Sequence, residues 1–255
     1  MYFLATTLKT FNIRTTDGEL GEVKDIYFDE KYWAVRYLVV DTIKWLPGKK
    51  VLLSPISFDH VDSKNSTVNI LASTDTVKNA PNKNEDEPVS KQDEVNLANH
   101  YGWPNYWSTV GPWGGFANPS VLAVSNKAAE IQDATEADHI DDHHLRSINE
   151  IKGDFTGYSV EGLDGKIGHV SDFVIDDTKW DISYLVVETS RLLVGNFILI
   201  AKDWVQDIEW HDKKVFVDIT EEQAKEAADF DTEKPITRDY EAELYSKLGK
   251  PKHWD

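Results

Sequence analysis

The most chemically distinctive stretch of this sequence is YGWPNYWSTVGPWGGF, at positions 101–116. It gathers aromatic side chains among glycines and prolines; they are Tyr101, Trp103, Tyr106, Trp107, Trp113 and Phe116. Amphipathic aromatic side chains on a loop can anchor a protein interface, or stack on a sugar or a base. Two interpretations are open: the loop presents a partner-binding surface, or it folds back onto its own domain and contributes to packing.

A second group of residues is rich in histidine and aspartate, within EADHIDDHHLR at positions 136–146. The candidate metal ligands in it are His139, Asp142, His143 and His144. Histidines four residues apart on a helix can share a divalent metal, with carboxylate oxygens as further ligands. The same composition is typical of a solvated polar linker, so a metal site and a plain linker both stay open. No other cofactor is predicted.

Catalytic patterns are scarce. Asp25 with Asp29, and Asp172 with Asp176, have the residue types of acid/base catalysis, although hydrogen bonding at turns and strand ends accounts for them more simply. The chain has no G-x-S-x-G elbow, Walker loop, dinucleotide glycine fingerprint or H-E-x-x-H sequence. It has no cysteine, which excludes disulfides, thiolate zinc sites and cysteine nucleophiles. The sequence therefore predicts a protein that is not an enzyme.

Charge and length restrict the partners and the architecture. The chain has 45 acidic and 27 basic residues, a formal net charge of −18, and such a field repels the phosphate backbone of nucleic acids. Its longest apolar runs, such as FILIA at 197–201, are far shorter than the roughly 20 residues of a membrane-spanning helix. We expect a cytoplasmic protein of two domains that binds a protein partner, or forms a homodimer, and that does not insert into a membrane.

The elements that must position these residues occur twice. DGELGEVKDIYFDEKYWAVRYLVVDT at 17–42 aligns with DGKIGHVSDFVIDDTKWDISYLVVET at 164–189. The same offset of about 147 residues, without a gap, also aligns VLL at 51–53 with ILI at 198–200, which indicates a duplicated domain. Trp103 and Tyr106 have no aromatic counterpart in the second copy, where Lys250 and His253 stand.

Each copy reads as short strands followed by helices. VRYLVVD and ISYLVVE have the β-branched and aromatic content of buried strands, and the segments 61–70 and 208–219 read as hairpins. Gly21 and Gly168 are interpreted as structural, at a tight turn or a close strand crossing. Ser90 and Thr237 can cap helices that end near Gly102 and Gly249, and Thr220 with Gln223 resembles a capping box.

These residues resemble the PRC-barrel family, named for the cytoplasmic domain of the photosynthetic reaction-centre H subunit and also found in a ribosome maturation factor. The resemblance rests on DGELGEVKDIYFDE, YLVVDT and WLPGKKVLLSP, with weaker counterparts in the second copy, and on YEAELY followed by G-x-P-x-x-W, which is similar to the tail of bacterial double-domain members. It implies a barrel that docks against other proteins and carries no chemistry of its own. This sequence shows neither the membrane helix of the reaction-centre subunit nor the additional barrel domain of the ribosome factor, so neither role carries over directly.

The predicted fold class is mainly β with short α tails, as two duplicated small β-barrels that are each followed by helical segments. We expect residues 1–107 to form the first barrel with its tail, residues 108–147 a linker, and residues 148–255 the second barrel with its tail. The predicted function is a non-enzymatic interaction or assembly module. The alternatives are a peripheral component of a photosynthetic or other membrane complex, and a small-molecule or sugar binder or enzyme that uses the aromatic loop and carboxylates.

Overall fold

The structure of the chain is a computed structural model that describes residues 1–42, 50–81, 88–125, 145–153, 156–189, 196–227, 229–252 and 254. These residues separate into two compact units. The first unit comprises Met1, residues 6–148 and residues 176–181, and the second comprises residues 2–5, 149–175 and 182–255. Each unit is therefore built mostly from one half of the sequence and contains a short segment from the other half.

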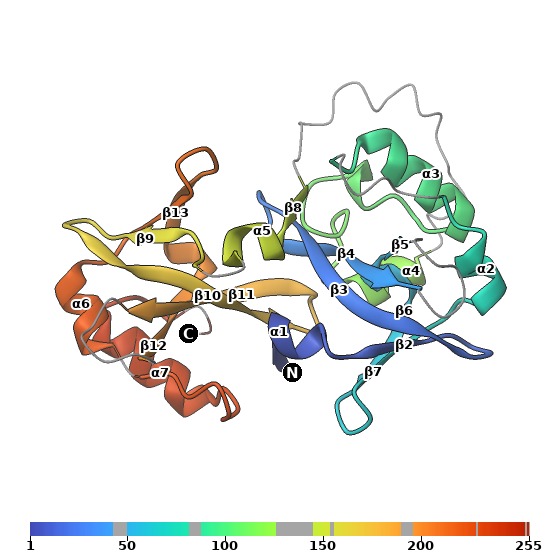
Figure 1. The fold of residues 1–255 in the computed structure, drawn as a ribbon. Helices are drawn as coiled ribbons and strands as arrows, with labels where there is room; N and C mark the ends of the chain where they lie inside the picture. The colour runs from blue at the N-terminus through green and yellow to red at the C-terminus, as the bar shows by residue number, and fades with distance from the viewer. Residues whose placement is uncertain are drawn as a thin grey trace. The chain divides into compact units, whose positions relative to one another are not determined.

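The first unit is a curled antiparallel sheet (Figure 1). Its strands are β2 (Asn12–Arg14), β3 (Glu19–Asp29), β4 (Ala34–Asp41), β5 (Lys50–Leu53), β6 (Phe58–Asp62), β7 (Thr67–Ile70) and β8 (Leu145–Ser147). Hydrogen bonding connects them in the order β5-β4-β3-β2-β7-β6, with β8 on β3. The β2–β7 pair is parallel and the other pairs are antiparallel. The two ends of this path, β5 and β6, are consecutive in the chain and are joined through the buried 3₁₀ turn η1 (Pro55–Ser57).

Short helices accompany the strands of the first unit. They are α1 (Ala5–Leu8), α2 (Thr74–Lys78), α3 (Lys91–Tyr101) and α4 (Pro119–Ala123), with the 3₁₀ turn η2 (Tyr106–Ser108) between the last two. Leu97 of α3 packs on Tyr37 and Val39 of β4 and on Leu52 of β5. Neighbouring strand residues point to opposite faces, so β4 is buried on one face by the sheet's own core and on the other by α3. This explains why β4 is apolar along nearly its whole length.

The second unit repeats this arrangement. Its strands are β1 (Tyr2–Leu4), β9 (Ser159–Glu161), β10 (Lys166–Asp176), β11 (Asp181–Thr189), β12 (Phe197–Ala201), β13 (Val205–Glu209) and β14 (Lys214–Val217). They pair in the order β12-β11-β10-β9-β14-β13, with β1 on β10 and a 3₁₀ turn η5 (Lys202–Trp204) between β12 and β13. Its helices are α5 (Ile148–Lys152), α6 (Glu221–Glu226) and α7 (Arg238–Lys247). The strand order matches that of the first unit element by element.

The leading strand of each half belongs to the opposite unit. β1 and α1 open the first half of the sequence, and β8 and α5 stand at the equivalent place before the second half. β1 pairs with β10 of the second unit, whereas β8 pairs with β3 of the first, where Tyr27 lies opposite Ser147. The expected linker 108–147 thus contributes α4 and β8 to the first unit where it is described.

The duplication extends to unusual backbone conformations. Trp33 and Trp180 have φ values of 57° and 52°, and Ser66 and Lys213 have φ values of 50° and 53°. These are the left-handed positions of the β3–β4, β10–β11, β6–β7 and β13–β14 turns. Asp17 and Asp164 also have matching roles, because each accepts a backbone hydrogen bond of 2.7 Å at the start of a helix, from Thr74 and Glu221. Such coincidences follow from one domain design used twice.

The mainly β fold class is confirmed, and the pairing of the described strands does not close into a hydrogen-bonded ring. In each sheet, the two strands at the ends of the pairing order follow one another in the sequence. A 3₁₀ turn, η1 or η5, joins these two strands in place of hydrogen-bonded strand pairing. The predicted helix ends are also confirmed: Ser90 and Thr220 head capping boxes, Thr237 caps α7, and Gly102 and Gly249 adopt positive φ just after α3 and α7. Within the described part of the chain, no helix is long and apolar enough to cross a membrane.

Gly21 and Gly168 are required by the close approach of two strands. A Cβ at Gly21 would lie 1.9 Å from the carbonyl oxygen of Asp41, and one at Gly168 would lie 2.0 Å from that of Glu188. We expect Gly21→Ala to lower the free energy of unfolding by about 2 kcal/mol or more, because β3 and β4 must separate to admit the methyl group. Urea unfolding measures this, with Gly18→Ala as control, where the nearest neighbour of the added methyl group is the Thr74 hydroxyl oxygen at 3.2 Å, so only a small shift is needed. Equal losses in the two variants would contradict the steric explanation.

Candidate functional site

The aromatic stretch 101–116 is divided between the interior and the surface of the first unit. Tyr106 and Trp113 are buried, whereas Tyr101, Trp103, Trp107 and Phe116 are partly exposed. The glycines follow this path, since Gly111, Gly114 and Gly115 all have positive φ. Packing against the stretch's own domain therefore holds two of the six predicted residues, and only the other four have surface to offer a partner.

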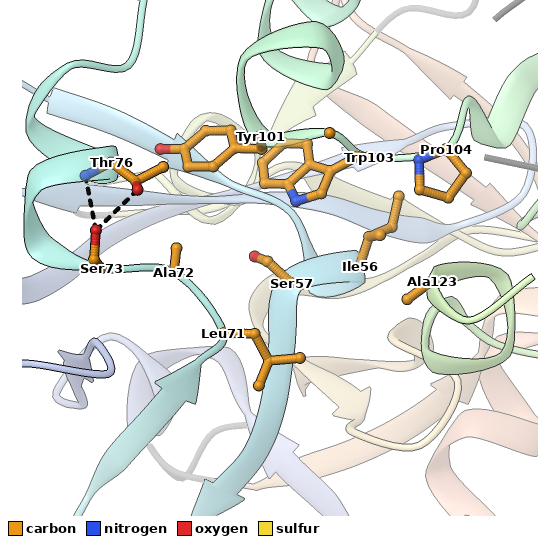
Figure 2. A pocket seen from close by; sticks show the side chains of 11 residues that line it. Ile56, Ser57, Leu71, Ala72, Ser73, Thr76, Tyr101, Trp103, Pro104 and Ala123 are labelled. Atoms are coloured by element: carbon orange, nitrogen blue, oxygen red, sulfur yellow. Dashed lines mark hydrogen bonds between the residues drawn. The ribbon is translucent and has the colours of Figure 1, made fainter. Parts of the chain in front are cut away.

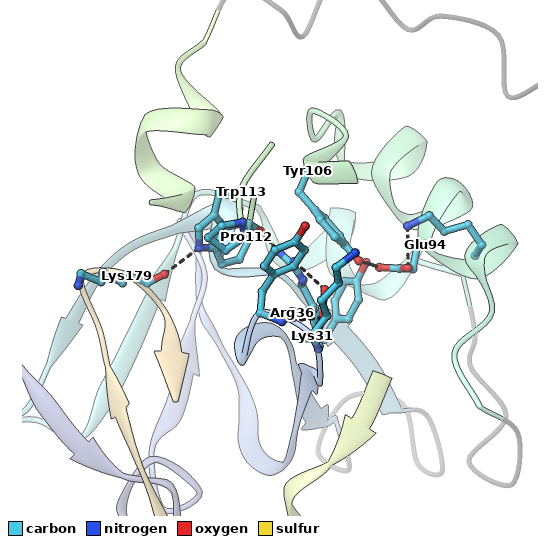
Figure 3. A network of polar contacts seen from close by, with 11 residues as sticks. Lys31, Arg36, Glu94, Tyr106, Pro112, Trp113 and Lys179 are labelled. Carbon is cyan, nitrogen blue, oxygen red and sulfur yellow. Dashed lines mark hydrogen bonds and ion pairs between the residues drawn. The ribbon is translucent and has the colours of Figure 1, made fainter. Parts of the chain in front are cut away.

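Arg36 organises the buried part of this stretch (Figure 3). Its guanidinium forms an ion pair of 2.9 Å with Asp29, and both side chains are at most 1% exposed. The same group donates to the carbonyl oxygen of Pro112 and lies 3.7 Å from the ring centre of Tyr106 and 4.8 Å from that of Trp113. A charge removed from water needs compensating partners, and here a carboxylate, a carbonyl and two aromatic faces provide them, while the buried Nε has no hydrogen-bond partner among the described residues.

Glu94 of α3 forms a second buried centre, which we call the carboxylate clamp: Tyr37, Lys91, Glu94 and Trp107. Tyr37 donates a 3.0 Å hydrogen bond to Glu94, Lys91 donates one of 3.2 Å, and the Tyr106 hydroxyl donates to the same carboxylate. The Lys91 ammonium lies 3.8 Å from the ring centre of Trp107. Burial lowers the pKa of Lys91, and the charge of Glu94 opposes that shift. The clamp fixes the helical tail to strand β4.

The second unit contains the same clamp at equivalent positions: Tyr184, Arg238, Glu241 and Trp254. Tyr184 donates a 2.6 Å hydrogen bond to Glu241, and Arg238 pairs with Glu241 at 3.1 Å. The Arg238 guanidinium lies 4.3 Å from the ring centre of Trp254. Tyr2 donates at 3.2 Å to the same carboxylate, as Tyr106 does in the first unit. The clamp is therefore part of the repeated design, and it accounts for Trp107 and Trp254 as structural residues.

A surface pocket of about 440 Å³ opens on the first unit where the aromatic stretch begins (Figure 2). Eleven residues line it: Ile56, Ser57, Leu71, Ala72, Ser73, Thr76, Tyr101, Gly102, Trp103, Pro104 and Ala123. They come from η1, the end of β7, α2, the end of α3 and α4. The Trp103 ring stacks on Tyr101 with centres 4.2 Å apart and planes 9° apart, so one face of the indole is covered. The pocket lies within the size range of ligand and anchor-residue sites.

The polar groups of the pocket are largely occupied by the protein itself. Ser57 donates its hydroxyl to the carbonyl oxygen of Ser54 at 2.8 Å, and the Ser73 hydroxyl accepts from the Thr76 amide at 3.1 Å and bonds the Thr76 hydroxyl at 2.9 Å. The Tyr101 hydroxyl is buried and lacks a hydrogen-bond partner among the described residues, and burial raises its pKa. No carboxylate, imidazole or ammonium lines the pocket. It offers apolar walls rather than acid/base groups.

A comparison with known families identifies the first 77 residues of the chain. Residues 1–77 match the family model of the PRC-barrel domain, which spans β1 to α2. The chain carries a PRC-barrel domain. No protein of curated description matches the sequence. The match ends before α3, so the pocket joins residues of the PRC-barrel domain, from Ile56 to Thr76, to residues of its helical tail.

The remaining predicted residues have simple positions. Asp25 accepts from the Ser147 hydroxyl at 2.6 Å and Asp172 from the Phe173 amide at 2.8 Å, while Asp29 and Asp176 accept turn amides, so hydrogen bonding at turns and strand ends occupies all four carboxylates. The metal candidates lie outside the described residues; they are His139, Asp142, His143 and His144. The described residues themselves contain no cluster of three or more metal-binding side chains.

Sequence reasoning missed Glu94 and the pocket. A signal for Glu94 was present, because Tyr37, Lys91 and Glu94 align with Tyr184, Arg238 and Glu241 at the offset of the duplication. Nothing in the sequence indicated the pocket, since its walls come from positions 56 to 123 and no repeated motif connects them. Of the six aromatic candidates, only Tyr101 and Trp103 line it.

The buried ion pair of the PRC-barrel domain gives a matched test. Asp29 and Asp176 occupy equivalent turns, and both accept turn amide hydrogen bonds, but position 183, the counterpart of Arg36, is a serine. We expect Asp29→Asn to lower the free energy of unfolding by about 3–5 kcal/mol, because it leaves the Arg36 charge buried and unpaired. Asp176→Asn should cost about 1 kcal/mol or less. Chemical denaturation compares the two, and similar costs would show that the ion pair contributes little.

The clamp tyrosines predict a dependence on alkaline pH. Burial, reinforced by the Glu94 charge, raises the pKa of Tyr37 and Tyr106 well above the ordinary value of 10.0. The unfolded chain then releases these protons first, so their contribution is complete below about pH 10 and is lost as the pH rises further. We expect the free energy of unfolding to fall as the pH rises above about 10, and Tyr37→Phe to reduce that slope by up to about 1.4 kcal/mol per pH unit. Urea unfolding across this range measures it, and an unchanged slope would contradict the assignment.

Proposed function

We propose that this protein is a cytoplasmic, non-enzymatic interaction or assembly module, in which the second copy is a further PRC-barrel and the first unit presents the docking surface. The PRC-barrel match in residues 1–77 supports this proposal, since domains of this kind are recruited into different assemblies. The composition of the pocket also supports it, because its lining residues include no general acid, general base or cysteine nucleophile. The chain contains no cysteine and therefore no disulfide, which is compatible with a cytoplasmic location.

One observation carries the proposal: exposed apolar side chains occur in, or next along the chain to, the segments that line the pocket. Leu71, which lines it, is 65% exposed, and Val121 and Val124, on either side of the lining residue Ala123, are 44% and 81% exposed. We call these three residues the apolar rim. Single exposed apolar residues are ordinary, but their recurrence in the segments that form a pocket with a tryptophan in its wall favours a protein-binding surface. The partner would cover the rim.

A matched set of variants tests this docking surface. We expect the rim variant, Leu71→Asp with Val124→Asp, to abolish specific retention of partners from a native lysate, since two carboxylates in the apolar rim would have to be desolvated on binding. Leu163→Asp is the control, because Leu163 is 58% exposed and belongs to the second unit. Affinity capture with quantitative mass spectrometry compares the three proteins, after circular dichroism has shown that each is folded.

Loss of the same partners in the Leu163→Asp control would show that the surface lies elsewhere. If the wild-type chain retains nothing that the rim variant loses, the interaction proposal fails. Size-exclusion chromatography with light scattering distinguishes a homodimer, since the chain would then be its own partner and the rim variant would be smaller in solution than the wild type.

A further inference from the structure

The residues that line the pocket beside the apolar rim favour some classes of ligand over others. A sugar or another polyhydroxylated ligand needs several free donors and acceptors, yet the hydroxyls of Ser57, Ser73 and Thr76 are engaged in hydrogen bonds within the protein. A charged ligand would need a counter-charge, and no charged side chain lines the pocket. An apolar or aromatic group is the occupant whose burial these walls favour.

Trp103 provides the directional element. One face of its indole is covered by Tyr101, and the ring also packs against the cluster of Tyr37, Val39 and Leu52, so its orientation is fixed. Within the described residues, no hydrogen bond is made by its ring nitrogen, which lies on the edge of the indole toward Ser57 and Ile56 in Figure 2. A fixed indole N–H beside an apolar hollow suits a peptide, because the backbone carbonyl of the inserted residue can accept from it.

The charged residues around the pocket indicate which residue types would flank the inserted residue in the partner's sequence. Three exposed carboxylates lie close in the chain to lining residues or contact a neighbour of one: Asp59, two residues after Ser57 and 2.8 Å from the His60 ring nitrogen, Asp75, beside Thr76 in α2, and Asp17, which accepts hydrogen bonds from Thr74. The backbone hydrogen bond from Thr74 lowers the pKa of Asp17, which therefore stays ionised at neutral pH. One partly buried lysine, Lys78, lies in the same helix. The balance is acidic, as in the whole chain with its net charge of −18, and it attracts basic groups.

We propose, on the basis of the proposed function, that the pocket receives one aromatic or large aliphatic side chain from a partner protein, in a segment whose flanking residues are lysine or arginine. The anchor fills the space between Trp103, Ile56 and Leu71, and its carbonyl oxygen accepts from the Trp103 indole. The basic flanks lie against Asp17, Asp59 and Asp75. The acidic surface opposes an anionic lipid headgroup for the same reason that it favours a basic segment.

Capped heptapeptides with one central phenylalanine between two pairs of lysines test this inference on the full-length protein. The readout is the indole N–H signal of Trp103 in a ¹⁵N-labelled chain, assigned with Trp103→Phe. We expect the phenylalanine peptide to shift this signal saturably, and the analogue with alanine at the centre to bind about tenfold more weakly or worse. The analogue with glutamate flanks should bind more weakly than the lysine peptide, and the difference should be larger at low salt than at high salt.

Two variants separate the anchor site from its surroundings. Tyr101→Phe keeps the stacked ring and removes the buried hydroxyl, so the phenylalanine peptide should bind it as it binds the wild type. Ala123→Glu introduces a charge into the wall and should abolish the shift, while Leu163→Asp in the second unit should leave it unchanged.

Equal affinity for the phenylalanine and alanine peptides would overturn the inference, as would a saturable Trp103 shift with methyl glucoside and none with the peptide. If the rim variant loses its partners in the capture experiment but no peptide binds, the docking surface stands and the anchor assignment is wrong. If peptides bind but the rim variant retains all partners, the pocket is a side-chain site that does not serve the assembly function.

Discussion

The architecture depends on a buried carboxylate that joins a helix to a strand. Glu94 and Glu241 are both almost fully buried, and each is held by a tyrosine from the central strand and a cation from its own helix, with a tryptophan over the cation. Burying such a charge is costly unless its lone pairs are filled. When the tyrosine and the cation both bind this carboxylate, the helix that carries it has one position and one rotation on the strand. The docking of each helical tail is therefore specific as well as stable.

In the first unit, the hydrogen-bond network around the buried carboxylate of Glu94 includes further residues. Tyr106 shares Glu94 with the clamp and stacks on Arg36, and Arg36 in turn binds Asp29 and the carbonyl of Pro112. A continuous series of charged groups and aromatic rings therefore runs from α3 through the aromatic stretch. Trp113 packs against Arg36 in this series and is buried. The second unit has serine at position 183 in place of Arg36, so this part of the network has no equivalent charge there. At the position equivalent to Trp103, which lines the pocket of the first unit, the second copy has Lys250.

The sequence predicted the features that depend on local pattern. The strands around YLVVDT and YLVVET, the hairpin turns, the capping residues and the repeat itself all follow from periodicity, turn composition and self-alignment, and the resemblance to PRC-barrels agreed with the later family match. The aromatic stretch was harder, because Tyr106 and Trp103 have the same character in sequence but opposite surroundings in space. Their difference is decided by Arg36 and Glu94, residues whose burial no local pattern reveals. The pocket, assembled from five separate segments, could not be found from sequence for the same reason.

The leading strands have a consequence for how the protein can be divided. β1 extends a sheet formed by the second half of the sequence, and β8, at the entrance to that second half, extends the sheet of the first. A fragment cut at the repeat boundary would therefore lack one native strand and retain another that has lost its sheet. In this chain, the duplicated sequence and the completed sheet have different boundaries. The unit of inheritance therefore differs from the unit of folding. Fusion of the two copies has made each dependent on residues encoded by the other.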